Sequence, residues 1–251
     1  MRVGAAALAG GVFGVIGTLC FFLAFGTDYW LLASDNCGPY TWPTETTTAV
    51  GNGTNATEIP PAEAVSEAPP GLILHHEGFF WRCVFQVEPS THALLATLLV
   101  NQPDSKVCIH GYLFPLPVAL GQVPHPNYDA TAVFRGFWTV LVILGLASAL
   151  AGGFLLVCGV PFISHKLYRL GGALLITAAC LFLLVLLLYV LWMEVVDVKR
   201  YVLQERGDTC PGAQVSVLYG LSFMAAAAGV PLELVSGLVF LLAGRALRGS
   251  K

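Results

Sequence analysis

The sequence predicts a membrane protein with four transmembrane helices, a small extracellular antiparallel β-sheet, and both termini in the cytosol. Three observations lead to this fold class. Of the 251 residues, 56% are hydrophobic and only 11% are charged, which differs strongly from the usual composition of soluble domains. Four apolar runs are each long enough to cross a bilayer. Along the chain, the segments outside these runs are in turn rich in basic and rich in acidic residues.

The first predicted span covers residues 1–27. Residues 3–27 carry no charge, and at 1.5 Å per residue they reach about 37 Å, more than a hydrocarbon core of roughly 30 Å. A cleaved signal peptide is the alternative, but its apolar region normally runs about 7 to 15 residues. Gly10 and Gly14 form a small-xxx-small pair, which favours close helix packing within the chain.

Residues 28–135 form a large loop with ten acidic and three basic side chains, a charge balance that favours the exterior. Within it, residues 39–70 are rich in Thr, Pro, Glu and Ala and poor in large apolar residues, so we expect this insert to be disordered. The insert contains two glycosylation sequons, with Asn52 and Asn55 as the acceptors.

Residues 72–74 and 79–87 are rich in β-branched and aromatic residues, a composition typical of strands. These runs predict the small extracellular sheet. His75 and His76 lie between them and raise the alternative of a metal site. Adjacent positions in a strand point to opposite faces, so the two side chains cannot easily bind one ion together. We expect the two histidines to lie in a solvated loop instead.

The second half of the chain alternates between spans and short connections. Tyr189 and Trp192 stand at the end of the third span, where we expect an interfacial aromatic pair. The predicted boundaries are span two at 136–164, a cytosolic turn at 165–169, span three at 170–193, a second extracellular loop at 194–214, span four at 215–244 and a cytosolic tail at 245–251.

The charge distribution predicts the orientation. The amino end, the 165–169 turn and the tail hold six Lys or Arg and no acid, whereas the two other loops hold fourteen acids and six bases. Positive charge accumulates on the cytosolic side of membrane proteins. Both termini are therefore expected in the cytosol. Four spans require the termini to lie on the same side of the membrane, which agrees with this orientation.

Four of the seven cysteines, Cys37, Cys83, Cys108 and Cys210, fall in the predicted extracellular loops, where disulfides form. Three connectivities are open for four cysteines. We favour Cys83 with Cys108, worth about 3 to 4 kcal/mol by loop closure, and Cys37 with Cys210. A zinc site is the alternative, but none of the spacings has the short form typical of zinc ligands.

Glu233 is the one acidic residue well inside an apolar span. An ionised carboxylate near a helix centre costs about 2.5 to 3.5 kcal/mol on insertion scales, so such residues often mark a transport pathway. The alternative, which we favour, is a neutral carboxyl group hydrogen-bonded to a residue such as Thr177 or Ser148, because no second buried charge completes a relay.

Several residues together resemble the first-loop signature of the claudin, peripheral myelin protein and epithelial membrane protein superfamily. They occur in the family's order: Trp30, Gly78, Phe79, Phe80, Trp81, Arg82, Cys83, Cys108 and Arg135. Longer blocks, at 25–33, 75–83, 101–103, 135–138 and 217–220, resemble one muscle-associated branch of this superfamily. The resemblance implies a left-handed four-helix bundle beneath the extracellular sheet.

The resemblance also implies a function: a plasma-membrane protein of muscle that binds the β1 integrin subunit through its extracellular part and restrains integrin signalling, differentiation and cell fusion. Two alternatives stay open. One is a claudin-like barrier or adhesion protein, and the other is a transporter or channel subunit that uses Glu233.

No catalytic motif is present, so the sequence predicts neither an enzyme nor a cofactor. It also contains no basic patch with interleaved aromatic residues, which argues against nucleic-acid binding. We expect the lipid bilayer and another membrane protein as partners, and no small-molecule substrate.

Overall fold

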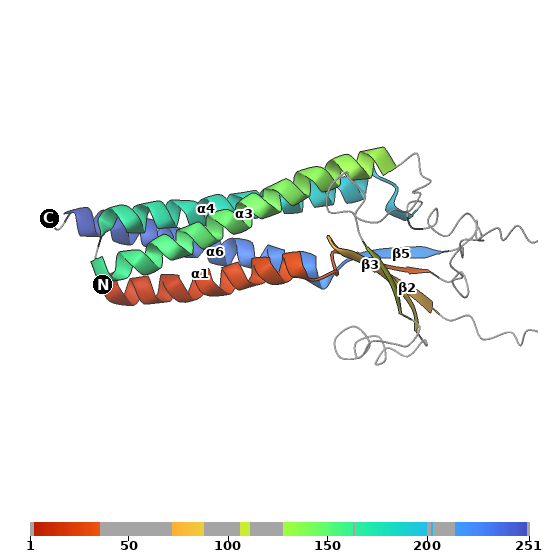
Figure 1. The fold of residues 1–251 in the computed structure, drawn as a ribbon, viewed down its shortest axis with the longest axis horizontal. Coiled ribbons are helices and arrows are strands. Elements are labelled where there is room, and N and C mark those ends of the chain that lie inside the picture. The colour runs from red at the N-terminus through yellow and green to blue at the C-terminus, as the bar shows by residue number, and fades with distance from the viewer. Residues whose placement is uncertain are drawn as a thin grey trace, which may run out of the picture.

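A computed structural model describes residues 3–35, 72–87, 106–110, 128–162, 164–199, 202 and 214–249. In these residues the chain forms a four-helix bundle with a β-sheet at one end (Figure 1). The first helix begins and the last helix ends at the opposite end of the bundle (Figure 1). The two parts meet at a junction that is packed with aromatic side chains, described below.

The four helices are α1 (Val3–Gly26), α3 (Tyr128–Phe162), α4 (His165–Val195) and α6 (Leu221–Gly249). Each contains a stretch long and apolar enough to cross a membrane. Large apolar side chains such as Leu8, Phe154 and Leu242 point outward from the bundle. A soluble protein does not expose so much apolar surface, whereas a bilayer accommodates it. The predicted four-span membrane fold is confirmed.

Neighbouring helices pack in the order α1, α6, α4, α3, and α1 makes only a few contacts with α3. Small residues allow the close approach of α1 to α6. Gly10, Gly14 and Gly17 face Val239, Ser236 and Glu233 across this interface, and the Ser236 hydroxyl donates a hydrogen bond to the carbonyl of Gly10 at 2.8 Å. The small-residue stripe therefore packs within the chain.

The sheet has five antiparallel strands in the order β4-β3-β2-β1-β5. They are β1 (Leu31–Asp35), β2 (Leu72–Glu77), β3 (Trp81–Val87), β4 (Val107–His110) and β5 (Val215–Tyr219). Strand β1, which lies between β2 and β5, follows α1 directly, and β5 leads into α6. The sheet is thus attached directly to the first and the last helix of the bundle, α1 and α6.

Several predicted boundaries were wrong. Residues 215–219, predicted as the start of the fourth span, form strand β5, because their β-branched side chains pair with β1. Residues 165–169, predicted as a turn, form the first turns of α4, which begins after the N-cap residue Ser164. Helix α3 begins at Tyr128, ahead of the predicted start of its span at 136. Hydropathy marks the membrane-crossing part of a helix and not its ends.

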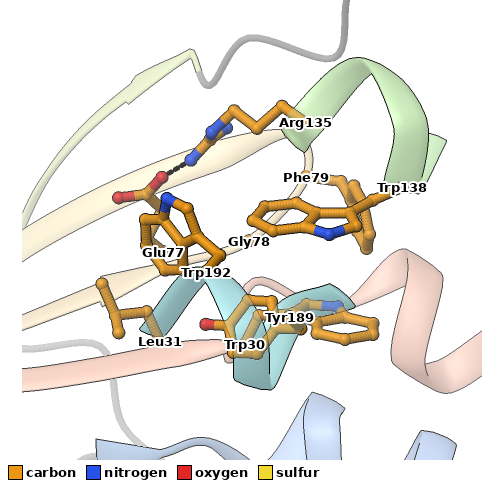
Figure 2. A pocket seen from close by; sticks show the side chains of 9 residues that line it. All are labelled: Trp30, Leu31, Glu77, Gly78, Phe79, Arg135, Trp138, Tyr189 and Trp192. Carbon is orange, nitrogen blue, oxygen red and sulfur yellow. Dashed lines mark ion pairs between the residues drawn. The ribbon is translucent and has the colours of Figure 1, made fainter. Parts of the chain in front are cut away.

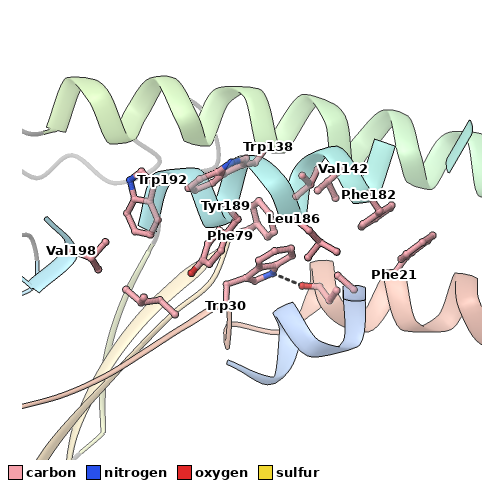
Figure 3. Packing of buried hydrophobic residues seen from close by; sticks show 14 of the residues in the cluster. Phe21, Trp30, Phe79, Trp138, Val142, Phe182, Leu186, Tyr189, Trp192 and Val198 are labelled. Atoms are coloured by element: carbon pink, nitrogen blue, oxygen red, sulfur yellow. Dashed lines mark hydrogen bonds between the residues drawn. The ribbon is translucent and has the colours of Figure 1, made fainter. Parts of the chain in front are cut away.

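One face of the sheet packs on the bundle. Leu31, Ala33 and Val215 belong to the same buried cluster as Trp192 and Val198 near the carboxyl end of α4 (Figure 3). In the other direction this cluster continues between the helices to Phe21 and Phe182, whose rings stack at 3.8 Å. A continuous apolar core therefore joins the sheet to the middle of the bundle.

Candidate functional site

The link between α1 and the sheet runs between two glycines, Gly78 and Gly220. A side chain at Gly78 would overlap the backbone of Asp28, and one at Gly220 would overlap the carbonyl group of Tyr29. In this space Gly220 N donates to the carbonyl of Trp30 at 3.0 Å. The close approach of three backbone segments explains why glycine stands at both positions.

Trp30 anchors this link to the bundle. Its indole Nε1 donates to the carbonyl of Ala24 at 2.7 Å, which satisfies a carbonyl in the last turn of α1. Its ring lies 5.1 Å from Phe79 and 5.3 Å from Tyr189, centroid to centroid. Trp30 and Phe79 are both buried, so these two residues of the predicted loop signature are packing residues.

Trp138, Tyr189 and Trp192 complete the aromatic cluster. Their ring centroids lie between 5.2 and 5.6 Å apart, within the range of favourable aromatic pairs. All three are buried, so the prediction that Tyr189 and Trp192 are interfacial anchors was wrong. Sequence reasoning missed their role because aromatic residues at the end of a span can lie either at the lipid interface or in a buried core. The sheet that covers them places them in the core.

Glu77 connects the sheet to α3 through two arginines. Its Oε2 accepts hydrogen bonds from Arg82 Nε at 3.0 Å and from Arg82 Nη2 at 2.8 Å. Its Oε1 pairs with Arg135 of α3 (Figure 2). The three side chains are between 8% and 14% exposed, so the charges interact where water screens them little. Glu77 was not among the predicted site residues, although its neighbours Arg82 and Arg135 were.

A pocket lies beside this ion-pair network (Figure 2). Its cavity measures about 20 Å³, room for about one water-sized group. Its lining combines the aromatic cluster with the edge of the ion-pair network: Trp30, Leu31, Glu77, Gly78, Phe79, Arg135, Trp138, Tyr189 and Trp192.

Strand β3 carries the exposed part of the signature. Cys83 and Cys108 stand opposite each other in β3 and β4 and form a disulfide, as predicted. Trp81, at the start of β3, is 38% exposed, and Val107 of β4 is also exposed. Phe80 is partly buried, with its ring 5.0 Å from that of Phe25.

Four other predicted residues lie outside the described part of the chain, namely Cys37, Cys210, Asn52 and Asn55. The second predicted disulfide and both glycosylation sites therefore remain predictions.

His75 and His76 are buried in strand β2, so their prediction as a solvated loop was wrong. His75 Nε2 lies 2.6 Å from Asp35 Oδ2. His76 Nδ1 donates to the carbonyl of Asp28 at 2.8 Å, and its Nε2 has no hydrogen-bond partner among the described residues. Burial lowers the pKa of His76 to about 4, because protonation would leave a charged N–H without an acceptor. No group of three metal-ligating side chains occurs within the described residues.

Glu233 is fully buried at the contact of α6 with α1. Thr18 Oγ1 donates to Glu233 Oε1 at 2.5 Å, whereas Thr177 bonds to a carbonyl of its own helix. The expected type of partner is therefore present, but it is Thr18 of α1 and neither of the two residues named above. Glu233 thus joins α6 to α1 and is not part of the junction pocket.

The structure thus gathers Trp30, Gly78, Phe79 and Arg135 at one junction and leaves Trp81 exposed on the sheet. This arrangement can hold a sheet rigidly on a membrane bundle. It presents no constellation of nucleophile, acid and base within the described residues.

Comparison with known proteins agrees with this architecture. The family profile described as PMP-22/EMP/MP20/Claudin tight junction matches residues 15–242. Transmembrane protein 182 of Mus musculus is 40% identical over 248 residues, which cover 98% of this chain and 97% of that protein. The Homo sapiens protein is 40% identical over 247 residues, 97% of each chain. The Danio rerio protein is 38% identical over 246 residues, 98% of this chain and 97% of that protein. The chain therefore belongs to the PMP-22/EMP/MP20/claudin family, and within it is similar to transmembrane protein 182.

Proposed function

We propose that this chain is a non-enzymatic plasma-membrane protein that binds another membrane protein through its sheet and the adjoining loops. The sheet faces the cell exterior, and both termini lie in the cytosol. The charge distribution supports this orientation, since four of the eight Lys and Arg in the described residues, namely Lys166, Arg169, Arg245 and Arg248, are exposed at the bundle end away from the sheet. The disulfide between Cys83 and Cys108 fits an oxidising exterior.

The single observation that carries the proposal is an exposed tryptophan on a rigid strand. Trp81 stands two residues from a disulfide and one residue from the ion-paired Arg82. Its backbone N–H donates to Asp28 Oδ1 at 3.2 Å, which fixes the start of β3 against the end of α1. A large aromatic side chain on a pre-ordered backbone is the common type of binding hot spot, because little entropy is lost when it docks.

The partner we propose is the β1 integrin subunit, and the consequence of binding is restraint of integrin signalling and of muscle-cell differentiation and fusion. Similarity to transmembrane protein 182 across nearly the full chain supports this assignment. A regulator of this kind needs no reacting group. It needs only a stable surface outside the membrane and a bundle that shares the bilayer with its partner.

Co-purification tests the proposal. The full-length protein, extracted from muscle membranes in a mild detergent, should bring the β1 integrin subunit with it. Trp81→Ala should reduce recovery about tenfold or more, the loss typical of a hot-spot aromatic. Phe154→Ala is the matched control, because Phe154 is an exposed aromatic residue on α3 and not on the sheet. Equal recovery with Trp81→Ala and wild type would contradict the proposal that the sheet forms the binding surface. If neither sample contained integrin, the proposed partner would be wrong.

A further inference from the structure

Four exposed cations lie at the end of the bundle away from the sheet, where α4 begins and α6 ends (Figure 1). Lys166 and Arg169 belong to the first two turns of α4, and Arg245 and Arg248 belong to the last two turns of α6. Within each pair the residues are three positions apart, so the two side chains share one face of their helix.

The close approach of α4 to α6 brings the two pairs together. A Cβ at Gly244 would lie 2.7 Å from Arg169 Cγ and 3.1 Å from the carbonyl oxygen of His165. Glycine therefore lets the end of α6 rest directly on the first turns of α4. Nearby, the buried rings of Tyr168 and Phe240 lie 5.8 Å apart, centroid to centroid, and hold the two helices together. The four cations thus belong to one surface.

No acidic residue compensates the charge of this surface. Residues 1–27, 136–193 and 234–251 contain no Asp or Glu, and these ranges include both ends of the chain and the whole connection between α3 and α4. Among the residues that the structure describes, none forms an ion pair with any of the four cations. Like charges close together repel each other, and an anion that binds between them relieves the repulsion. The surface therefore favours an anionic ligand.

The depth of the cations indicates that this ligand is a lipid headgroup. Leu170 follows Arg169 and is 54% exposed, and Leu242 lies about one turn before Arg245 and is 60% exposed. Such residues of a membrane helix face acyl chains. Basic side chains within one turn of them extend to the level of the headgroups. A lipid headgroup already occupies this depth, whereas a nucleic acid or an acidic protein would have to approach through the headgroup layer.

The chemistry of the cations distinguishes among anionic lipids. Three of the four are arginines, and a guanidinium group can bind two oxygens of one phosphate group, which an ammonium group does not. A phosphomonoester offers three acceptor oxygens and nearly two negative charges. Phosphoinositides carry such groups, whereas phosphatidylserine carries a phosphodiester and a carboxylate beside an ammonium group. Clustered basic residues at the end of a membrane helix are typical of phosphoinositide recognition.

We propose that the surface formed by Lys166, Arg169, Arg245 and Arg248 binds the phosphorylated inositol headgroup of a phosphoinositide in the adjacent leaflet. The acyl chains of the lipid lie against the exposed apolar side chains of α4 and α6. Binding itself requires only this surface. That the leaflet is the cytosolic one rests on the orientation of the protein given in the proposed function.

The test compares the full-length wild type with the double variant Arg169→Gln and Arg245→Gln. Each protein in mild detergent is titrated with phosphatidylinositol 4,5-bisphosphate and, separately, with phosphatidylserine, and native mass spectrometry measures the bound fraction. Wild type should bind the phosphoinositide about tenfold or more tightly than phosphatidylserine, because its headgroup carries more charge. The double variant should bind the phosphoinositide about 25-fold more weakly than wild type, since each basic residue near an anionic headgroup contributes about a factor of five.

Two further variants serve as controls. Lys106→Gln with Lys199→Gln removes the same amount of charge at the sheet end of the molecule, and its affinity should equal that of wild type. Arg169→Lys with Arg245→Lys keeps the positive charge at the surface, so its affinity should fall by no more than about fivefold, the effect of losing bidentate contacts.

Four results would overturn the proposal. They are equal affinity of wild type and the Gln double variant for the phosphoinositide, an equal loss in the Lys106 and Lys199 control, binding of phosphatidylserine as tight as that of the phosphoinositide, and a Lys double variant as weak as the Gln double variant. None of these readouts depends on integrin or on the orientation in the cell, so a failure here leaves the proposed function untouched.

Discussion

Replacing Glu77 with Gln should destabilise the protein more than replacing either arginine that pairs with it. The substitution keeps the shape of the side chain but removes the charge shared by Arg82 and Arg135. Two guanidinium groups, 14% and 11% exposed, would then each lose an ion pair with this carboxylate. Breaking a buried ion pair from one side costs about 3 to 5 kcal/mol, and we expect a value near the upper end. Arg135→Gln leaves Glu77 with Arg82, so about 2 kcal/mol is expected.

The free energy of unfolding can be measured in mixed micelles by SDS titration, with tryptophan fluorescence as the signal. The double variant Glu77→Gln with Arg135→Gln should be less destabilised than the sum of the two single variants, because both single changes break the same ion pair. Glu194→Gln is the control, since Glu194 is an exposed acid at the end of α4. A loss below about 1 kcal/mol for Glu77→Gln, the value typical of an exposed pair, would refute the role of this network.

Three further predictions concern the disulfide, His76 and Glu233. Replacing Cys83 and Cys108 together with Ser should lower the free energy of unfolding by about 3 to 4 kcal/mol and reduce surface delivery, measured by labelling of intact cells. His76 has a folded-state pKa of about 4 against its ordinary 6.5. In the unfolded protein His76 therefore binds its proton at a higher pH than in the folded protein. The free energy of unfolding should fall as pH drops from about 6.5 to about 4, by up to about 3 kcal/mol, and His76→Gln should flatten this dependence. Glu233→Gln should leave surface expression nearly intact, because the amide still accepts the hydrogen bond from Thr18, whereas Glu233→Lys should abolish it, because a buried cation would have no partner there.

Each of these predictions has a result that would contradict it. The disulfide prediction fails if reduction of the wild type leaves its melting temperature unchanged. The His76 prediction fails if wild type and His76→Gln lose stability in parallel between pH 6.5 and pH 4. The Glu233 prediction fails if the Gln variant abolishes an ion flux that the wild type shows in reconstituted vesicles, which would support the transporter alternative.

The sequence was sufficient to predict the four membrane spans and part of the sheet. Long apolar runs leave few alternatives to membrane helices, and β-branched residues around Cys83 marked β2 and β3. Strand β5 was missed because Val215–Tyr219 is apolar and continuous with the helix that follows. Hydropathy cannot separate a strand from a helix in one apolar run, whereas pairing with β1 does so directly.

The candidate site was predicted only in its local parts. Cys83 with Cys108 was the favoured pairing among three open connectivities, and the structure confirms this bond. The place of Glu77 between two arginines depends on residues 5 and 58 positions away from it in the chain, and no sequence period encodes such a distance. The partner of Glu233 is Thr18, 215 positions away, for the same reason. Contacts between distant elements emerge only when the bundle and the sheet are assembled.

The affinity of the membrane-embedded protein for the integrin ectodomain tests the proposed function most directly. Full-length protein in lipid nanodiscs, immobilised through its carboxyl terminus, can be titrated with the purified β1-containing ectodomain. We predict saturable binding that weakens about tenfold or more with Trp81→Ala and stays unchanged with Phe154→Ala. Binding of equal strength to all three forms, or to empty nanodiscs, would contradict the claim that the sheet presents the interaction surface.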